Sequence, residues 1–208
     1  MAASGLICVF AKPPVPGKVK TRLAAHLGPQ RAADFARAFL QVTWDLVSSL
    51  GWAQPVLATT ACAREALALP GEPRIWLQGE GDLGERIERI MRRALSESDN
   101  AIAIGADTPG LPARLLSEAA ERLQRVDAVL GPSADGGFYL IALRRCPADL
   151  LRGLPWSDSE TFAQTHARLT ARGLTVDVLE PWFDVDRPAD LERLRDQISR
   201  GAAYTTAS

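Results

Sequence analysis

The sequence is poor in the residues that build disulfide frameworks, zinc sites and hydrolase triads. Its 208 residues include three cysteines, widely spaced and without a CxxC pair, and two histidines. An odd number of scattered cysteines predicts reduced thiols and a cytoplasmic location, and it argues against a structural zinc site. Neither His26 nor His166 belongs to a Ser-His-Asp pattern, so a hydrolase triad is not expected either.

Two further absences limit the partners of this protein. The chain has no surplus of positive charge, with a formal net charge of −1, whereas proteins that bind nucleic acids or anionic membranes usually need a basic surface. It has no apolar run of membrane-spanning length, and no basic segment precedes its first apolar run, which predicts that there is no signal peptide. We therefore expect small-molecule partners, no nucleic acid and no membrane span, and we leave a homodimer open.

Lysine is scarce as well, and its few copies are clustered. All three lysines lie in the stretch FAKPPVPGKVKTRLA at residues 10–24, and every later Lys or Arg position is arginine. An arginine-favouring genome explains the scarcity but not the cluster. Because an ammonium is a compact point charge and a guanidinium is a planar fork, a loop with both can neutralise phosphate oxygens from different directions.

This basic loop has the features of a phosphate clamp. Its three prolines stiffen it, and its glycine allows a ligand to approach the backbone closely. The alternative is a solvated basic loop, and the spacing is not that of a P-loop. Lys20 lies where the chain turns towards a helix, so we expect it to point to solvent and to contribute least. We assign nucleotide phosphate binding to Lys12, Gly17, Lys18, Thr21 and Arg22.

Short apolar runs alternate with amphipathic segments along almost the whole chain. This alternation predicts a mainly parallel sheet covered by helices on both faces, in one α/β domain over residues 1–200 followed by a loose tail at 201–208. Ligands gather at the carboxyl ends of parallel strands, and every candidate motif falls there. The patterns predict strands at 5–11, 54–59, 74–78, 100–105, 127–131, 138–143 and 174–179, and helices at 30–50, 83–95, 112–124, 161–171 and 188–200, with a short helix between the second and third strands.

Carboxylates follow two of these strands. Asp107 comes directly after a buried strand in AIAIGADTPGLP, and Asp184 and Asp186 lie in FDVDRPADL. Each could cap the following helix instead, and this alternative is strongest for Asp186. Carboxylate oxygens are suitable ligands for Mg²⁺ or Mn²⁺. Two such strand ends favour a metal site, and we assign it to Asp107 and Asp186.

Two glycine-containing loops supply the other candidates. In GPSADGGFYLIAL, Asp135 could orient or deprotonate an acceptor, although the segment also fits an Asp-Gly turn. In GEGDLGERI, glycine amides at a helix start suit an anion or a base. Trp156 could form a wall of the substrate pocket or simply pack over a loop. We assign acceptor binding to Gly136, Gly137 and Trp156, and nucleotide binding to Gly81, Asp82 and Arg86.

Taken in order, these motifs resemble a bacterial family of glycosyltransferase-like proteins, formerly a domain of unknown function, with members linked to radical-SAM partners and arsenosugar biosynthesis. The resemblance covers nearly the whole chain, from FAKPPVPGKVKTRLA through IGADTPGLP and PWSDSETFAQT to FDVDRPADL. It implies the nucleotide-diphospho-sugar transferase fold, a Rossmann-like GT-A three-layer sandwich. The basic loop and the Asp-Gly-Gly segment are also similar to those of 2-phospholactate guanylyltransferases.

Two family patterns are altered or missing here. The Gly-x-Gly-x-Arg and Pro-Lys elements of sugar nucleotidyltransferases are absent, and the Asp-x-Asp of many glycosyltransferases is present only as Ala106-Asp107-Thr108. The resemblance implies a transferase that acts on an activated nucleotide with Mg²⁺ or Mn²⁺.

We weigh three functions, in order of preference, of which the resemblance implies the first two. The first is glycosyl transfer from a nucleoside-diphosphate sugar to a small acceptor, with Asp135, Lys18 and Arg22 as catalytic residues. The second is guanylyltransferase-like nucleotidyl transfer that releases pyrophosphate. The third is a catalytically silent nucleotide-binding module, which the replaced first carboxylate of Asp-x-Asp would favour.

Overall fold

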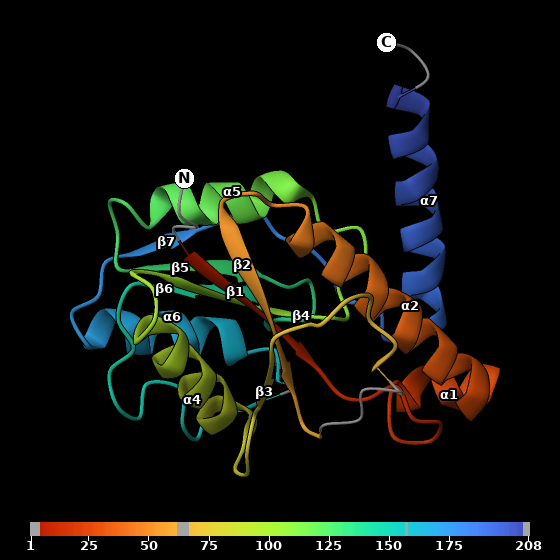
Figure 1. Cartoon of the computed structure of the whole chain (residues 1–208), viewed down its shortest axis with the longest axis horizontal. Helices are drawn as coiled ribbons and strands as arrows, with labels where there is room; N and C mark the ends of the chain where they lie inside the picture. The colour runs from red at the N-terminus through yellow and green to blue at the C-terminus, as the bar shows by residue number, and fades with distance from the viewer. Residues whose placement is uncertain (1–4, 62–66, 157, 206–208) are drawn as a thin grey trace.

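The computed structural model describes residues 5–61, 67–156 and 158–205. Within them, seven strands form one sheet in the order β3-β2-β1-β4-β6-β5-β7 (Figure 1). The strands are β1 (Gly5–Ala11), β2 (Ala53–Thr59), β3 (Ile75–Leu77), β4 (Ala101–Gly105), β5 (Ala128–Pro132), β6 (Phe138–Leu143) and β7 (Val176–Val178).

The sheet is mainly parallel, as predicted. β1 is central and pairs in parallel with β2 and β4, whereas β6 runs antiparallel to both β4 and β5. The exception has a local cause, because β5 and β6 are joined by residues 133–137 alone, and so short a link can connect only antiparallel strands. All seven predicted strands are confirmed, with ends that differ by at most two residues.

Helices cover both faces of the sheet and make it the middle of three layers (Figure 1). The side chains of β1 alternate between the two apolar cores: Ile7 and Val9 belong to one core, and Leu6 and Cys8 to the other. The first core includes side chains of α2 (Pro29–Ser48) and α5 (Ala113–Arg122), and the second includes those of α4 (Leu83–Leu95) and α6 (Thr161–Ala171). A strand buried on both faces explains the unbroken apolar sequence of β1.

Two helices complete the fold. α1 (Thr21–Leu27) follows the basic loop, and α7 (Pro188–Thr205) packs with Leu191 and Leu194 against the first core before it projects from the body (Figure 1). α7 continues five residues past its expected end at 200, so residues 201–205 of the expected loose tail are helical. The expected short helix after β2 overlaps residues 62–66, outside the described residues. No helix in the described part of the chain is long and apolar enough to cross a membrane.

Candidate active site

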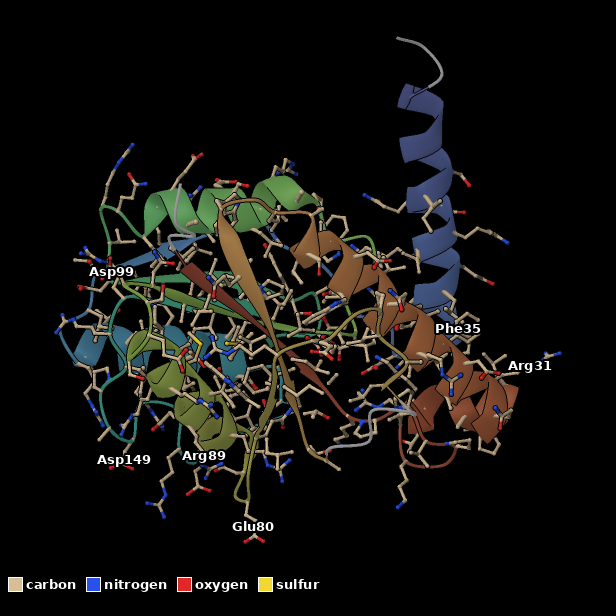
Figure 2. The ribbon with its side chains drawn as sticks, viewed as in Figure 1. Arg31, Phe35, Glu80, Arg89, Asp99 and Asp149 are labelled. Atoms are coloured by element: carbon tan, nitrogen blue, oxygen red, sulfur yellow. The ribbon has the colours of Figure 1, made fainter. Side chains whose placement is uncertain are left out.

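A cleft of about 670 Å³ lies at the carboxyl ends of β1 and β4. Its wall contains residues of the basic loop, Asp107, Asp135 and the segment 184–187, which are far apart in the sequence. A second hollow, of about 460 Å³, lies at the other end of β4 and is lined by Trp52, Asp99 and Arg144 among others. It contains none of the predicted site residues, and Figure 2 shows Asp99 on the side of the molecule away from α1.

Asp107 is held at its place by the backbone of the strand before it. The amide of Ala106 donates to the carbonyl of Phe10 at 3.0 Å, which extends the pairing of β4 with β1. A Cβ on Gly105 would come within 2.2 Å of Asp107 Oδ1, so the carboxylate lies in space that only a glycine leaves open. The carbonyl of Asp107 accepts from the amide of Val185 at 2.9 Å, and this bond brings the second acidic segment to the same edge.

Asp184 and Asp186 flank Val185, which is fully buried. The side chain that caps the start of α7 is that of Asp190 rather than Asp186. Asp190 Oδ2 accepts from the backbone amides of Asp186 at 3.0 Å and Arg187 at 2.7 Å. Both Asp184 and Asp186 line the cleft. The sequence analysis named both residues as candidates but assigned only Asp186, with Asp107, to the metal site.

Asp184 is the most perturbed carboxyl group of the cleft. Burial raises its pKa to about 8, and repulsion from Asp107, Asp135 and Asp186 adds to this rise, while Lys20 opposes it. Its Oδ1 atom is buried and has no hydrogen-bond partner in the described part of the chain. A buried, unpartnered carboxylate oxygen beside other carboxylates is a common feature of functional sites.

These carboxylates fit a divalent cation. They are the hard oxygen donors that Mg²⁺ and Mn²⁺ prefer, and the unpartnered oxygen of Asp184 is a coordination position that nothing else uses. Among the described residues, no three acidic, histidine or cysteine side chains are already grouped as a ligand set. A cation would therefore take some of its ligands from water or substrate, as Mg²⁺ commonly does.

Lys20 does not point to solvent, and this expectation was wrong. Its Nζ donates to Asp186 Oδ1 at 2.7 Å and lies 3.7 Å from Asp107 Oδ2, with only 10% of the side chain exposed. The backbone of Lys20, just before α1, adopts the left-handed conformation (φ 46°, ψ 47°). This conformation is rare for residues other than glycine. The ammonium is thereby turned into the cleft.

The other cations of the basic loop fit their assignment. Lys12 and Lys18 are exposed and line the cleft, and neither pairs with a carboxylate among residues with described positions. Thr21 and Arg22 also line it, and Arg22 Nη1 lies 3.6 Å from Asp186 Oδ2 with 56% of its side chain exposed. Gly17 is not part of the cleft wall; its φ of 78° serves the turn of the loop instead.

The segment after β3 fits its assignment only in part. Asp82 is the N-cap of α4: its Oδ1 accepts from the amide of Glu85 at 2.9 Å, and Glu85 Oε2 accepts from the amide of Asp82 at 2.9 Å. Its Oδ2 accepts from the amide of Gly153. Neither Asp82 nor Gly81 lines the cleft, so the structure gives Asp82 a capping role. Arg86 does line the cleft, and its buried Nε has no described partner.

Three of the four residues assigned to the acceptor, Asp135, Gly137 and Trp156, line the cleft. Asp135 lines the cleft and also accepts from the amide of Gly137 at 3.1 Å, so it forms the expected turn without leaving the site. Gly136 is packed, because a Cβ there would come 2.4 Å from Ser159 Cα, and it does not line the cleft. Trp156 does line it, with its ring edge-on to Phe138 at a centroid distance of 5.9 Å.

Gln78 is a cleft residue that the sequence analysis missed. It is 4% exposed, and its Nε2 donates to the carbonyls of Ala58 at 2.8 Å and Ala11 at 3.5 Å, the ends of β2 and β1. Since both neighbours are acceptors, the NH₂ group of the Gln78 side chain must face them, and its carbonyl oxygen must face away. No sequence pattern indicates this role, because the two strand ends meet only in the folded sheet.

Comparison with known proteins agrees with this geometry. The family model described as uncharacterized protein conserved in bacteria (DUF2064) matches residues 43–158, more than half of the chain. A crystal structure from Desulfovibrio desulfuricans G20, assigned provisionally as a nucleotide-diphospho-sugar transferase, shares 31% identity and a TM-score of 0.81, over 89% of this chain and 83% of that one. The predicted nucleotide-diphospho-sugar transferase fold is therefore confirmed.

Two curated relatives are guanylyltransferases. The 2-phospho-L-lactate guanylyltransferase of Methanothermobacter thermautotrophicus is 27% identical over 176 residues, which cover 83% of this chain and 76% of the relative. The phosphoenolpyruvate guanylyltransferase of Sphaerobacter thermophilus is 29% identical over 196 residues, which cover 88% and 90%. Both names describe transfer of a guanylyl group to a small phosphorylated acid.

Proposed function

The chain belongs to the DUF2064 family and is a transferase of the nucleotidyl- or glycosyl-transferring class, and we propose that it transfers a nucleotidyl group from a nucleoside triphosphate to a small phosphorylated acid. GTP is the donor that the two curated relatives suggest. The observation that carries the proposal is the meeting of three carboxylates and the basic loop in one cleft. The two guanylyltransferase relatives favour nucleotidyl transfer over glycosyl transfer, which was the first choice from the sequence alone.

The charges of the cleft suit a triphosphate. Lys12, Lys18 and Arg22 lie on the loop side and can hold phosphate oxygens, since an ammonium or guanidinium makes a charge-assisted bond to each. Arg86 adds a further cation from α4. Gln78 also lines the cleft, and its side-chain carbonyl oxygen is the group that would accept a hydrogen bond from an N–H group of the base.

Three carboxylates line the same cleft as these cations. Asp107, Asp184 and Asp186 would hold Mg²⁺ or Mn²⁺, and a divalent cation there supplies positive charge that offsets the charge of the departing pyrophosphate. The residues themselves bind and orient the reactants. The acceptor's phosphate oxygen forms a bond to the α-phosphorus, the bond from the α-phosphorus to the bridging oxygen breaks, and pyrophosphate leaves with the electron pair.

Asp135 has a different part in the two reactions. A phosphate acceptor is already ionised near pH 7, because its second pKa is about 6, so nucleotidyl transfer to it needs no general base. In that reaction Asp135 and the Gly137 turn position the acceptor. A sugar-accepting hydroxyl would instead need Asp135 to take its proton. The effect of Asp135→Asn therefore separates the two: a small loss of turnover fits nucleotidyl transfer, and a large loss fits glycosyl transfer.

Glycosyl transfer from a nucleoside-diphosphate sugar remains the second candidate, because the D. desulfuricans relative is assigned to nucleotide-diphospho-sugar transferases. The released product distinguishes the two reactions. The protein should be incubated with Mg²⁺, GTP and either 2-phospho-L-lactate or phosphoenolpyruvate, and separately with nucleoside-diphosphate sugars and small acceptors that carry a free hydroxyl. Phosphorus NMR should show pyrophosphate in the first set. Release of a nucleoside diphosphate from a sugar donor, with no pyrophosphate from any triphosphate, would favour glycosyl transfer.

A further inference from the structure

Lys20 is an internal cation among the carboxylates of the cleft. Its ammonium touches Asp186 and lies within ion-pair distance of Asp107, and its side chain is largely buried. The centroid of the Phe39 ring lies 5.9 Å from Nζ of Lys20. Lys12 and Lys18, from the same loop, have no carboxylate partner among the described residues. Lys20 therefore neutralises part of the negative charge of Asp107 and Asp186, with which the other two lysines form no ion pair.

The carboxylates that bind Lys20 are two of those assigned above to the divalent cation. We propose that Lys20 competes with that cation for Asp107 and Asp186, and that the phosphates of a bound nucleotide draw its ammonium away. This inference rests on the proposed function, because it needs a metal and a nucleotide in the same cleft. It assigns to Lys20 a positioning role that couples the binding of the two ligands.

Competition follows from the distances. Nζ lies 2.7 Å from Asp186 Oδ1, and a bound Mg²⁺ would lie about 2.1 Å from a carboxylate oxygen. Two cations on one carboxylate would repel each other strongly in a partly buried site. The lysine has a flexible four-carbon stem, so its ammonium can leave while the backbone stays in place.

The ammonium has a second set of partners only when a nucleotide is present. Phosphate oxygens held by Lys12, Lys18 and Arg22 would lie in the same cleft and can accept hydrogen bonds from Lys20. The metal should then bind weakly alone and more tightly with the nucleotide, and by linkage the nucleotide should also bind more tightly with the metal. Without Lys20, most of this coupling should disappear.

Direct Mn²⁺ binding tests this without reference to turnover. Electron paramagnetic resonance measures free Mn²⁺ for wild type, Lys20→Met and Lys18→Met, first alone and then with saturating GTP. Lys18→Met removes the same charge from the same cleft but has no carboxylate partner, so it is the matched control. We expect Lys20→Met to bind Mn²⁺ alone about tenfold more tightly than wild type, within the usual range of such couplings. GTP should then tighten Mn²⁺ binding in the variant much less than in wild type, whereas Lys18→Met should leave Mn²⁺ affinity without GTP close to the wild-type value.

Three results would overturn the inference. Equal effects of Lys20→Met and Lys18→Met on Mn²⁺ affinity would mean that only net charge matters. Weaker Mn²⁺ binding by Lys20→Met would mean that Lys20 supports the site. No Mn²⁺ binding by wild type, with or without GTP, would overturn the metal site of the proposed function as well. Thermal unfolding identifies a misfolded variant, in which case Lys20→Gln, which keeps a polar side chain of similar length, carries the same comparison.

Discussion

The two sides of the cleft are built differently. On the acidic side, backbone hydrogen bonds join Ala106 to β1 and Asp107 to Val185, and the side chain of Asp190 accepts from the amide of Asp186. On the basic side, Lys12 and Lys18 are exposed on a loop and have no carboxylate partner among the described residues. Lys20 belongs to the basic loop but is bound to the acidic side.

The difference indicates which side is preorganised. The backbone that carries these carboxylates need not move when Lys20 gives way to a cation, whereas long exposed side chains lose rotamer freedom when they bind a phosphate. We therefore expect variants on the acidic side to affect the reaction itself, and variants on the basic side to affect nucleotide affinity.

The largest effect should come from the acidic side. Asp107→Asn removes a charged metal ligand while keeping the shape of the side chain, so turnover should fall about 10²- to 10³-fold, as when an enzyme loses one group that stabilises transition-state charge. Asp99→Asn is the matched control, because Asp99 lies at the other end of β4, away from the cleft. Pyrophosphate release measures both. Similar turnover in the two variants would contradict the role of Asp107.

On the basic side, the effect should be on binding. Lys12→Ala and Lys18→Ala each remove a charge-assisted contact to phosphate, which should weaken GTP binding about ten- to hundredfold. Their effect on turnover at saturating GTP should be much smaller. Titration calorimetry at moderate salt gives the affinities. If both variants bind GTP as wild type does, the loop is merely a solvated segment.

The pH dependence of stability should follow Asp184. Its pKa of about 8 in the folded state lies far above the usual value of 3.8, so between about pH 4 and pH 8 the folded carboxyl holds a proton that the unfolded chain has lost. The metal-free protein should therefore lose stability as pH rises from 6 to 8, by at most about 1.4 kcal/mol per pH unit for one proton. Urea unfolding in EDTA checks this against Asp184→Asn, which should lack that slope. Parallel pH profiles of the two proteins would contradict it.

The smallest effect should come from Asp82, which caps α4 outside the cleft. Asp82→Ala should lower the free energy of unfolding by about 1 kcal/mol, as lost N-caps do. GTP affinity should not change. Urea unfolding and calorimetry on the same preparation separate these effects. A clear loss of GTP affinity with unchanged stability would restore Asp82 to the nucleotide site.

Much of this could be predicted from the sequence, because the strands and helices follow local apolar patterns. Asp107, Asp135 and the basic loop were placed at the cleft from their positions after strands. The capping box of α4 could have been recognised as well, since Asp82 and Glu85 have its spacing.

The remaining features depend on contacts between distant segments. The orientation of Lys20 depends on a left-handed backbone and on a partner 166 residues away. Likewise, Gln78 is held by the carbonyls of Ala58 and Ala11, from two other strands. The pKa of Asp184 is raised first by burial in the folded protein and then by Asp107, Asp135 and its neighbour Asp186. No local pattern encodes such meetings.

The central claim is that the acidic side holds a divalent cation that the nucleotide needs. Calorimetric titration of GTP into the wild-type protein, once with Mg²⁺ and once with EDTA, tests it most directly. The account predicts GTP binding at least about tenfold tighter with Mg²⁺, within the usual range of coupling between two ligands. Equal GTP affinity in Mg²⁺ and in EDTA would contradict it.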